Sequence, residues 1–322
     1  MTLSIVVPCY NEEENIKAFY EEILKIGFQL TVELELIFIN DGSKDKTISI
    51  IKELAHLDPR VYYISFSRNF GKEAAMLAGL EYARGDAIVI LDADLQHPPS
   101  LIPDMVEKYQ QGYDQVVAKR TRKGESNIRT FLSKLYYRSM NRFIDVDIVD
   151  GVGDFRLLSR KALNALLALK EYNRFSKGLF SWIGFKEYII EYENVTRDAG
   201  ESKWSFSKLL NYGIDGVISF NNKPLRISIY IGLLVTLLSL LYVGVMLFQI
   251  IVNGIDVPGY FTIISAVLIL GGIQLVFLGV VGEYIGRIYY ESKRRPIYIV
   301  EDENMKMNQE QHESYAENKL KN

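Results

Sequence analysis

Two long stretches near the C-terminal end contain no charged residue, and they constrain the fold of this chain more than any other feature. Ile227–Ile255 covers about 29 residues and Val257–Gly282 about 26, whereas a helix needs about 20 apolar residues to cross a bilayer. Soluble helices of this length normally carry a polar stripe, and neither stretch has one. We therefore expect two membrane-spanning helices, over residues 227–252 and 260–286, rather than a pair of buried core helices.

Basic residues flank this pair of stretches on both outer sides, while the connector of residues 253–259 has no lysine or arginine. By the positive-inside rule, both outer ends lie in the cytoplasm. We expect residues 287–322 to form a polar cytoplasmic tail that is disordered from Glu301 to Asn322. The flanking basic residues are Lys223, Arg226, Arg287, Lys293, Arg294 and Arg295.

Residues 1–202 have the pattern of a cytoplasmic α/β domain. Short β-branched runs alternate with segments of helical spacing, which predicts a mostly parallel, Rossmann-like sheet flanked by helices. The apolar run at the N-terminus is too short, and too soon followed by acidic residues, for a signal peptide. The expected strands are Leu3–Val7, Leu34–Ile39, Val61–Phe66, Ala87–Leu91 and Phe155–Leu158, and the expected helices are Glu12–Leu24, Asp45–Leu54 and Glu73–Ala83.

Charge and cysteine content exclude several classes of function. A formal net charge of −3 lacks the basic excess of nucleic-acid-binding proteins, so we expect no nucleic-acid partner. Cys9 is the only cysteine, so neither an intramolecular disulfide nor a cysteine-rich metal cluster can form. The first strand end, Pro8–Glu12, has no glycine, and this absence of a G-x-G-x-x-G fingerprint disfavours a nicotinamide or flavin enzyme.

Two segments outside the apolar stretches have an amphipathic pattern. Arg129–Ile144 places Phe131, Tyr136 and Met140 near one helical face, with basic residues elsewhere, and residues 203–226 have a similar mixture. Such helices suit the surface of an anionic membrane. Both segments fit equally well as caps on the core of the domain, and the pattern alone leaves the two readings open.

The strongest local motif is Asp92-Ala93-Asp94-Leu95-Gln96, which follows the expected strand Ala87–Leu91. Two carboxylates at positions i and i+2 of an irregular segment offer hard oxygen ligands to Mg²⁺ or Mn²⁺, and the Gln96 amide adds a carbonyl oxygen. A lone Asp-x-Asp is often only turn chemistry. Here a metal site is favoured, because other strand ends also carry polar side chains.

Those other strand ends would lie at the same edge of a parallel sheet, where such sheets bind ligands. Asp41 is suited to accept hydrogen bonds from a base or ribose, and Arg68 and Lys72 are suited to approach phosphates. Each of these residues taken alone is more typical of a turn. The segments concerned are Pro8-Cys9-Tyr10-Asn11-Glu12, Asn40-Asp41-Gly42-Ser43 and Ser67–Lys72.

Together these segments resemble the nucleotide-binding half of the inverting family-2 glycosyltransferases, which have the GT-A fold. Further motifs, followed by two spans, resemble the polyprenyl-phosphate glycosyltransferases, which include dolichol-phosphate mannose synthases and bacterial bactoprenol glycosyltransferases. The resemblance runs from about Leu3 to Pro296, with one departure at Asn40, where many relatives have a second aspartate. The further motifs are Ser67–Ala75, Asp92–Pro99, Gly151–Arg160 and Ser202–Leu209.

The resemblance implies a role for each motif residue. Asp92, Asp94 and Gln96 would meet the metal, and Asp154 would be the catalytic base. Arg197 and Lys203 would bind the donor diphosphate or the acceptor phosphate. The nucleotide sugar would contact Pro8, Tyr10, Asn11, Glu12, Asp41, Arg68, Lys72, Asp92 and Ala93.

The resemblance also implies a reaction, in which a UDP-sugar donates its sugar to undecaprenyl or another polyprenyl phosphate at the cytoplasmic membrane face. The acceptor phosphate has a second pKa near 6 and is already largely ionised at neutral pH, so Asp154 would orient groups as much as remove a proton. The stretches Glu193–Leu209 and Asp150–Arg160 resemble the Gram-positive stress-associated branch, which favours UDP-N-acetylglucosamine over UDP-glucose as donor.

Other readings follow from the same features. A processive polysaccharide synthase would need many spans and a Q-x-x-R-W motif, and the sequence has neither. A non-catalytic membrane scaffold of the same fold is the second alternative. The product would supply a flippase and a further glycosyltransferase that modify the cell envelope. Small residues in the second stretch (Gly271, Gly272, Gly279 and Gly282) would permit close helix contacts, which is compatible with a homo-oligomer.

Overall fold

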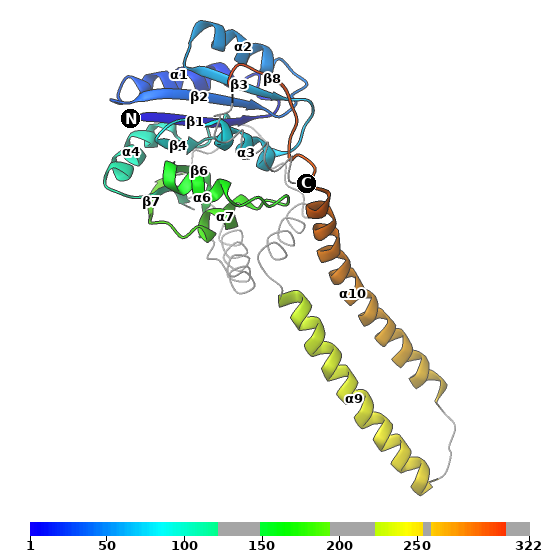
Figure 1. Ribbon diagram of the computed structural model, residues 1–322. Helices are drawn as coiled ribbons and strands as arrows, with labels where there is room; N and C mark the ends of the chain where they lie inside the picture. Colours follow the sequence, from blue (N-terminus) through cyan, green and yellow to red (C-terminus); the bar gives the residue numbers. More distant parts are fainter. Residues whose placement is uncertain (122–148, 194–222, 254–258, 307–322) are drawn as a thin grey trace.

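The computed structural model describes residues 1–121, 149–193, 223–253 and 259–306 (Figure 1). Within these residues one sheet has eight strands in the order β7-β5-β6-β4-β1-β2-β3-β8. Its centre is parallel, β6 runs antiparallel to both of its neighbours, and β8 closes the far edge antiparallel to β3. The strands are β1 (Thr2–Cys9), β2 (Glu33–Asn40), β3 (Val61–Phe66), β4 (Ala87–Ile90), β5 (Gln115–Thr121), β6 (Val152–Ser159), β7 (Glu187–Glu193) and β8 (Val300–Glu303).

Helices cover both faces of the sheet, and each face has its own hydrophobic core. Successive residues of a strand point to opposite faces, so Ile5 and Val7 join the core that contains Phe19, while Val6 joins the one that contains Phe180. One core is built with α1 (Ile16–Gly27), α2 (Thr47–Leu57) and α4 (Ile102–Gln110, preceded by the 3₁₀ turn Pro99–Leu101), and the other with α3 (Lys72–Tyr82), α6 (Arg160–Leu167) and α7 (Ser176–Trp182).

Helix α3 lies unusually close to the sheet, and this position matters because its first residue, Lys72, reaches the candidate site. The approach depends on Gly79, where a Cβ atom would lie 2.2 Å from Cγ1 of Val6 and 2.6 Å from Cδ1 of Ile39. Only glycine fits there without moving the strand side chains. The absence of a side chain at Gly79 therefore allows the backbone of α3 to lie close to the sheet.

The expected α/β architecture is confirmed, and the expected strands and helices are all present; β3 has the expected ends, and the other elements have shifted ends. Helix α1 begins at Ile16 rather than at Glu12, because the residues before it are tied to the loop after β2. The Glu12 N–H donates to Thr47 Oγ1 (2.9 Å), and the Glu13 N–H donates to Asp45 Oδ2 (3.2 Å). These contacts hold the ends of β1 and β2 together.

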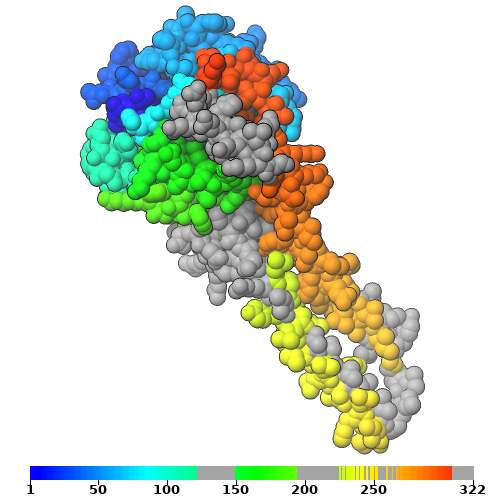
Figure 2. Space-filling view, viewed as in Figure 1, coloured from blue at the N-terminus to red at the C-terminus, as the bar shows by residue number. Residues whose placement is uncertain are grey.

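The two apolar stretches form α9 (Lys223–Asn253) and α10 (Tyr260–Lys293), which project from the α/β part side by side (Figures 1 and 2). Each contains a segment long and apolar enough to cross a membrane, Tyr230–Gln249 and Ile269–Lys293, and neither segment is buried in the protein. Both helices extend beyond the expected spans. The first amphipathic segment, residues 129–144, lies outside the described residues, and so does the part of the second that covers residues 203–222.

The expectation of a disordered tail from Glu301 onward is wrong for its first residues. The chain turns back after α10, and β8 pairs with β3. Tyr298 is buried and stacks on Phe66 with ring centroids 4.8 Å apart, and Asn304 Oδ1 accepts a hydrogen bond from the Tyr63 N–H (2.7 Å). We call residues 296–306 the strap. The strand in the strap was not predicted because its sequence is polar, and an edge strand turns alternate side chains to solvent.

Candidate active site

The sheet order places the predicted residues around one edge. Strands β1 to β4 are parallel, so the segments that follow them meet at their carboxyl ends. Strand β6 is antiparallel to β4, with Arg156 opposite Ile90, so the beginning of β6 lies at that same edge. Asp154, at the beginning of β6, is therefore brought next to Asp92, which follows β4. The sequence predicted both residues but not that they would be neighbours.

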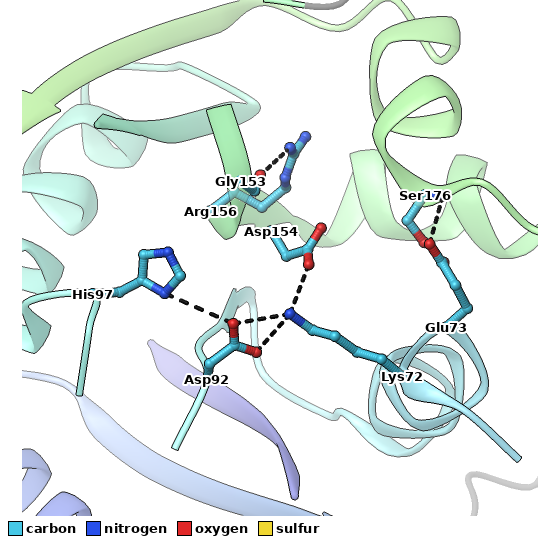
Figure 3. Close-up of polar contacts among 8 residues, drawn as sticks. All are labelled: Lys72, Glu73, Asp92, His97, Gly153, Asp154, Arg156 and Ser176. Carbon is cyan, nitrogen blue, oxygen red and sulfur yellow. Dashed lines mark hydrogen bonds and ion pairs between the residues drawn. The ribbon is translucent and has the colours of Figure 1, made fainter. Parts of the chain in front are cut away.

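Lys72 joins these two carboxylates (Figure 3). Its Nζ lies 2.8 Å from Oδ1 and 2.9 Å from Oδ2 of Asp92, and 2.8 Å from Oδ2 of Asp154. The ammonium faces both oxygens of Asp92 at once. The site thus contains one positive charge held between two negative ones, at the end of a side chain that is 45% exposed.

The pKa values follow from this arrangement. Burial lowers the pKa of Lys72, but the carboxylates of Asp154 and Asp92 outweigh burial and hold it above the ordinary lysine value. Burial raises the pKa of Asp154, and the Lys72 ammonium outweighs burial, so the net pKa lies below the ordinary value. Asp154 is therefore ionised at neutral pH and is a weak base.

His97 is a site residue that the sequence reasoning quoted in a motif but did not assign. Its ring packs against Phe155, and its Nδ1 is buried and lies 3.8 Å from Oδ2 of Asp92. This nitrogen has no hydrogen-bond partner among the residues that the structure describes. Burial lowers the pKa of His97 below the ordinary value, which favours the neutral imidazole. A neutral, unpartnered ring nitrogen beside a carboxylate is a suitable metal or donor-group ligand.

The other predicted metal residues lie on the irregular segment between β4 and the 3₁₀ turn. Leu95 has a positive φ of 55°, and Asp94 Oδ1 accepts a hydrogen bond from the Gln96 N–H (3.1 Å). Ala93, between the two aspartates, is buried. Asp92 and Asp94 thus lie on one short irregular segment, as the motif predicted. Their role as metal ligands stays a prediction.

The residues present fit a hard divalent cation. Asp92 already binds a cation, the Lys72 ammonium, and His97 supplies an unpartnered nitrogen beside it. Among the described residues, no three His, Cys, Asp or Glu side chains are grouped so as to hold a metal by themselves. The carboxylate part of this set fits Mg²⁺ or Mn²⁺, which bind one or two carboxylates and complete their shell with water and substrate phosphate.

Asp41 has a structural task in addition to the predicted one. Its carboxylate is buried and accepts the backbone N–H groups of Phe70 (2.6 Å) and Gly71 (3.0 Å). Burial raises its pKa despite these bonds. The next residue, Gly42, has a φ of 63° and lies against the backbone of Arg68, which would be 2.3 Å from a Cβ atom. Asp41 and Gly42 together fix the loop that leads into Lys72.

The remaining predicted donor residues lie around the same edge. Tyr10, at the end of β1, is 42% exposed, and Pro8 is within β1. Asn11 Oδ1 accepts a hydrogen bond from the Lys44 N–H (2.9 Å), and Glu12 Oε2 accepts one from Asn15 Nδ2 (2.6 Å). The Arg68 guanidinium lies over the Phe70 ring, 4.1 Å from its centroid. Their contacts with a donor remain predictions, and the predicted phosphate ligands Arg197 and Lys203 lie outside the described residues.

A further layer of charge behind Asp154 was missed from the sequence. Arg156 is buried, donates to the Gly153 carbonyl (2.9 Å) and lies over the Phe180 ring at 3.7 Å. Burial lowers its pKa to about 10. Burial also lowers the pKa of Lys177, another cation that acts on Asp154. A basic residue within a strand normally suggests a solvent-facing position, so no local signal marked Arg156.

Comparison with known proteins decides the family. Residues 4–167 match the family model described as glycosyl transferase family 2, and residues 223–288 match that of the GtrB C-terminal hairpin. The chain belongs to glycosyl transferase family 2. In this glycosyltransferase the first match covers the parallel centre of the sheet and the Lys72, Asp92 and Asp154 cluster, and the second covers the two apolar helices.

Two relatives of this glycosyltransferase are similar over nearly the whole chain, and a solved structure is similar over about two thirds of it. A putative glycosyltransferase CsbB of Bacillus subtilis (strain 168) is 57% identical over 94% of this chain and 92% of its own length. A bactoprenol glucosyl transferase of Shigella phage SfV is 45% identical over 95% of this chain and 100% of its own. A solved glucosyl-3-phosphoglycerate synthase from Mycobacterium tuberculosis is 19% identical, with a TM-score of 0.45 over 67% of this chain and 77% of that one.

Proposed function

We propose that this glycosyltransferase moves a sugar from a UDP-sugar to the phosphate of a polyprenyl phosphate, with inversion at the anomeric carbon. The observation that carries the proposal is the convergence of Asp92 and Asp154 on one cation at the ligand-binding edge of the sheet. Support comes from relatives that are bactoprenol glucosyl transferases and from the two apolar helices. A scaffold without catalysis would have no need for three charges held together at this edge.

Asp92 and Asp94, with Gln96, would hold Mg²⁺ or Mn²⁺, which when bound neutralises charge on the leaving diphosphate. Around it, Arg68 and Lys72 would bind the donor phosphates, and Arg197 and Lys203 the donor or acceptor phosphate. Asp41 would hold their loop and face the base or ribose. Tyr10, Asn11 and Glu12 would complete the donor side at the end of β1, beside Pro8 and near Ala93.

Asp154 would position the acceptor rather than act as a strong base. Its pKa is held low by Lys72, and the acceptor phosphate is already largely ionised at neutral pH, so neither partner calls for a proton transfer. A carboxylate in this position orients the sugar hydroxyls or the acceptor for attack opposite the leaving group. Replacing Asp154 by asparagine should therefore lower turnover without shifting the pH profile.

Both apolar helices would span the membrane, with the α/β domain of residues 1–202 and the end of the chain in the cytoplasm. Anchoring holds the site at the level of the lipid headgroup and lowers the entropic cost of bringing the acceptor to it. Truncation at Asn222 would be a poor test, because it would also remove the strap. A better test compares long-chain and short-chain polyprenyl phosphates on the full chain, and equal activity with both would argue against this role.

Two donors are proposed for the test. The names of the relatives favour UDP-glucose, since the Shigella phage SfV protein is a bactoprenol glucosyl transferase. The sequence resemblance favoured UDP-N-acetylglucosamine, and the more similar CsbB has no sugar in its name. The product would then pass to a flippase and a second glycosyltransferase that modify the cell envelope. The small residues in α10 are compatible with close helix contacts in a homo-oligomer.

The test is transfer of radiolabel from UDP-glucose, UDP-N-acetylglucosamine or GDP-mannose to undecaprenyl phosphate, with the full chain purified in detergent and Mn²⁺ or Mg²⁺ added. We expect label from one UDP-sugar to enter the organic phase and to be lost when a chelator is added. Transfer that persists with the chelator would contradict the metal assignment. No transfer from any donor, with the protein shown to be folded, would favour the scaffold.

A further inference from the structure

Lys72 occupies the position that a metal bound by Asp92 would need. Its ammonium contacts both carboxylate oxygens of Asp92, at 2.8 and 2.9 Å, and is held from the other side by Asp154. A chelating carboxylate offers a cation this same position between its two oxygens. A divalent ion that approached Asp92 would meet a positive charge a few ångströms away, and like charges at that separation repel strongly in a partly buried site.

The Lys72 side chain is able to leave while its backbone stays in place. The residues before it are fixed, because the Phe70 and Gly71 N–H groups are bound to Asp41. The side chain itself is 45% exposed and has a flexible four-carbon stem, so its ammonium can swing without a change in the helix. Lys72 is also the first residue of α3, a position from which a lysine commonly reaches a phosphate.

We infer that Lys72 is the resident counter-ion of the empty site, and that a divalent cation and a nucleoside diphosphate displace it together. The cation takes Asp92, and the diphosphate takes the released ammonium. Lys72 therefore couples the two ligands: each binds weakly alone and more tightly when the other is present. The inference rests on the proposed function, in which Asp92 is a metal ligand.

The same exchange changes Asp154. While Lys72 is in place, one oxygen of Asp154 is bound at 2.8 Å and is not available to an acceptor. When the ammonium leaves, the cations Arg156 and Lys177 still act on Asp154 electrostatically. The carboxylate that positions the acceptor is thus released only when the donor side is loaded.

The experiment is a titration of the full chain in detergent with Mn²⁺, with and without UDP, and with free Mn²⁺ measured by electron paramagnetic resonance. The variants are Lys72→Met, which removes the competing charge, and Lys72→Arg, which keeps it. The matched control is Lys177→Met, which removes another cation that acts electrostatically on Asp154. It separates competition for Asp92 from a general loss of positive charge.

Without UDP, we expect Lys72→Met to bind Mn²⁺ about tenfold more tightly than the wild type, within the usual range of coupling between sites. Lys72→Arg should stay near the wild type, and Lys177→Met should change the affinity by no more than about twofold. UDP should tighten Mn²⁺ binding about tenfold in the wild type and much less in Lys72→Met. Equal or weaker Mn²⁺ binding by Lys72→Met, while the wild type does bind, would overturn the inference and leave the proposed function intact.

A second measurement uses the wild type alone and is independent of whether a variant folds. Amine-directed labelling read by mass spectrometry reports how accessible the Lys72 amine is to the reagent. Saturating Mn²⁺ should raise the labelling of Lys72 severalfold, and added UDP should suppress it again. Unchanged labelling with Mn²⁺ bound would overturn the inference. Absence of Mn²⁺ binding in the wild type, even with UDP, would instead overturn the metal assignment of the proposed function and the inference with it.

Discussion

Removal of the Tyr298 ring should detach the strap from the sheet. The ring is 8% exposed and stacks on Phe66 at 4.8 Å with an interplanar angle of 16°, and its hydroxyl donates to Glu81 Oε2. Truncation of a buried aromatic side chain to alanine costs about 3–5 kcal/mol. Burial already raises the pKa of Glu81, and loss of the tyrosine hydroxyl would leave that carboxyl without this bond.

The magnitude and its parts can be measured on three variants. Tyr298→Ala should lower the apparent melting temperature of the detergent-purified chain by about 6–20 °C, at about 2–4 °C for each kcal/mol. Tyr298→Phe keeps the ring and removes only the hydroxyl, so we expect about a quarter to a half of that shift. Ile299→Ala is the matched control, since its neighbouring side chain is 53% exposed and should shift the temperature by no more than about 2 °C.

Ligand binding provides a second readout of the same variants. The Ile299 carbonyl accepts a hydrogen bond from the Ser67 N–H (3.0 Å), and Ser67 begins the loop that leads to Lys72. A detached strap should therefore raise the UDP concentration needed to tighten Mn²⁺ binding. If Tyr298→Ala and Ile299→Ala melted at the same temperature as the wild type, the strap would not be docked as described, and the reasoning would fail.

Three further predictions follow from other residues. Asp94→Ala should lower transfer by at least about 100-fold while the protein still inserts in membranes, measured by radiolabel transfer and membrane fractionation; robust activity would exclude Asp94 as a metal ligand. Hydrogen bonds from the Arg60 guanidinium lower the pKa of Asp58 to about 2, below its value in the unfolded chain. The ionised Asp58 therefore stabilises the fold by about 2 kcal/mol above about pH 4, and this stabilisation is lost as the pH falls toward 2. Asp58→Asn should flatten the dependence of melting temperature on pH between about 4 and 2, and an unchanged slope would contradict this assignment. Gly42→Ala should lower the free energy of unfolding by at least about 2 kcal/mol, because φ is 63° and the new Cβ would lie 2.3 Å from the Arg68 backbone. An unchanged melting temperature in thermal unfolding would contradict this prediction.

Much of the fold could be predicted because its signals are local. Alternating and β-branched runs marked the strands β1 to β4, and the charge-free stretches marked α9 and α10. The position of the Asp92 motif directly after a buried strand was also local, and the structure places it there. Helix ends were less predictable: Glu12 and Asp45 favour helix starts by residue type, but contacts between the two loops hold both residues outside their helices.

What could not be predicted depends on contacts between residues that are far apart in the sequence. Lys72 was expected to approach phosphates, and no local pattern indicated that it lies between two aspartates on β6 and after β4. That contact requires β6 to enter the sheet antiparallel, beside β4, after a long intervening segment. The strap was missed for a similar reason, because its pairing partner β3 is more than 200 residues away.

The strap also explains how the second apolar helix is connected to the edge of the sheet that carries the candidate site. Near the end of α10, Glu291 Oε2 accepts a hydrogen bond from the Tyr172 N–H (3.0 Å), and Tyr290 stacks on the Tyr172 ring at 5.9 Å. A few residues later the strap reaches the end of β3 and binds Ser67. The helix end is thus attached to the α/β domain at two places, one of them the loop that carries Lys72. A movement of α10 would act directly on that loop, because the connection is short and its ring contacts are buried or stacked.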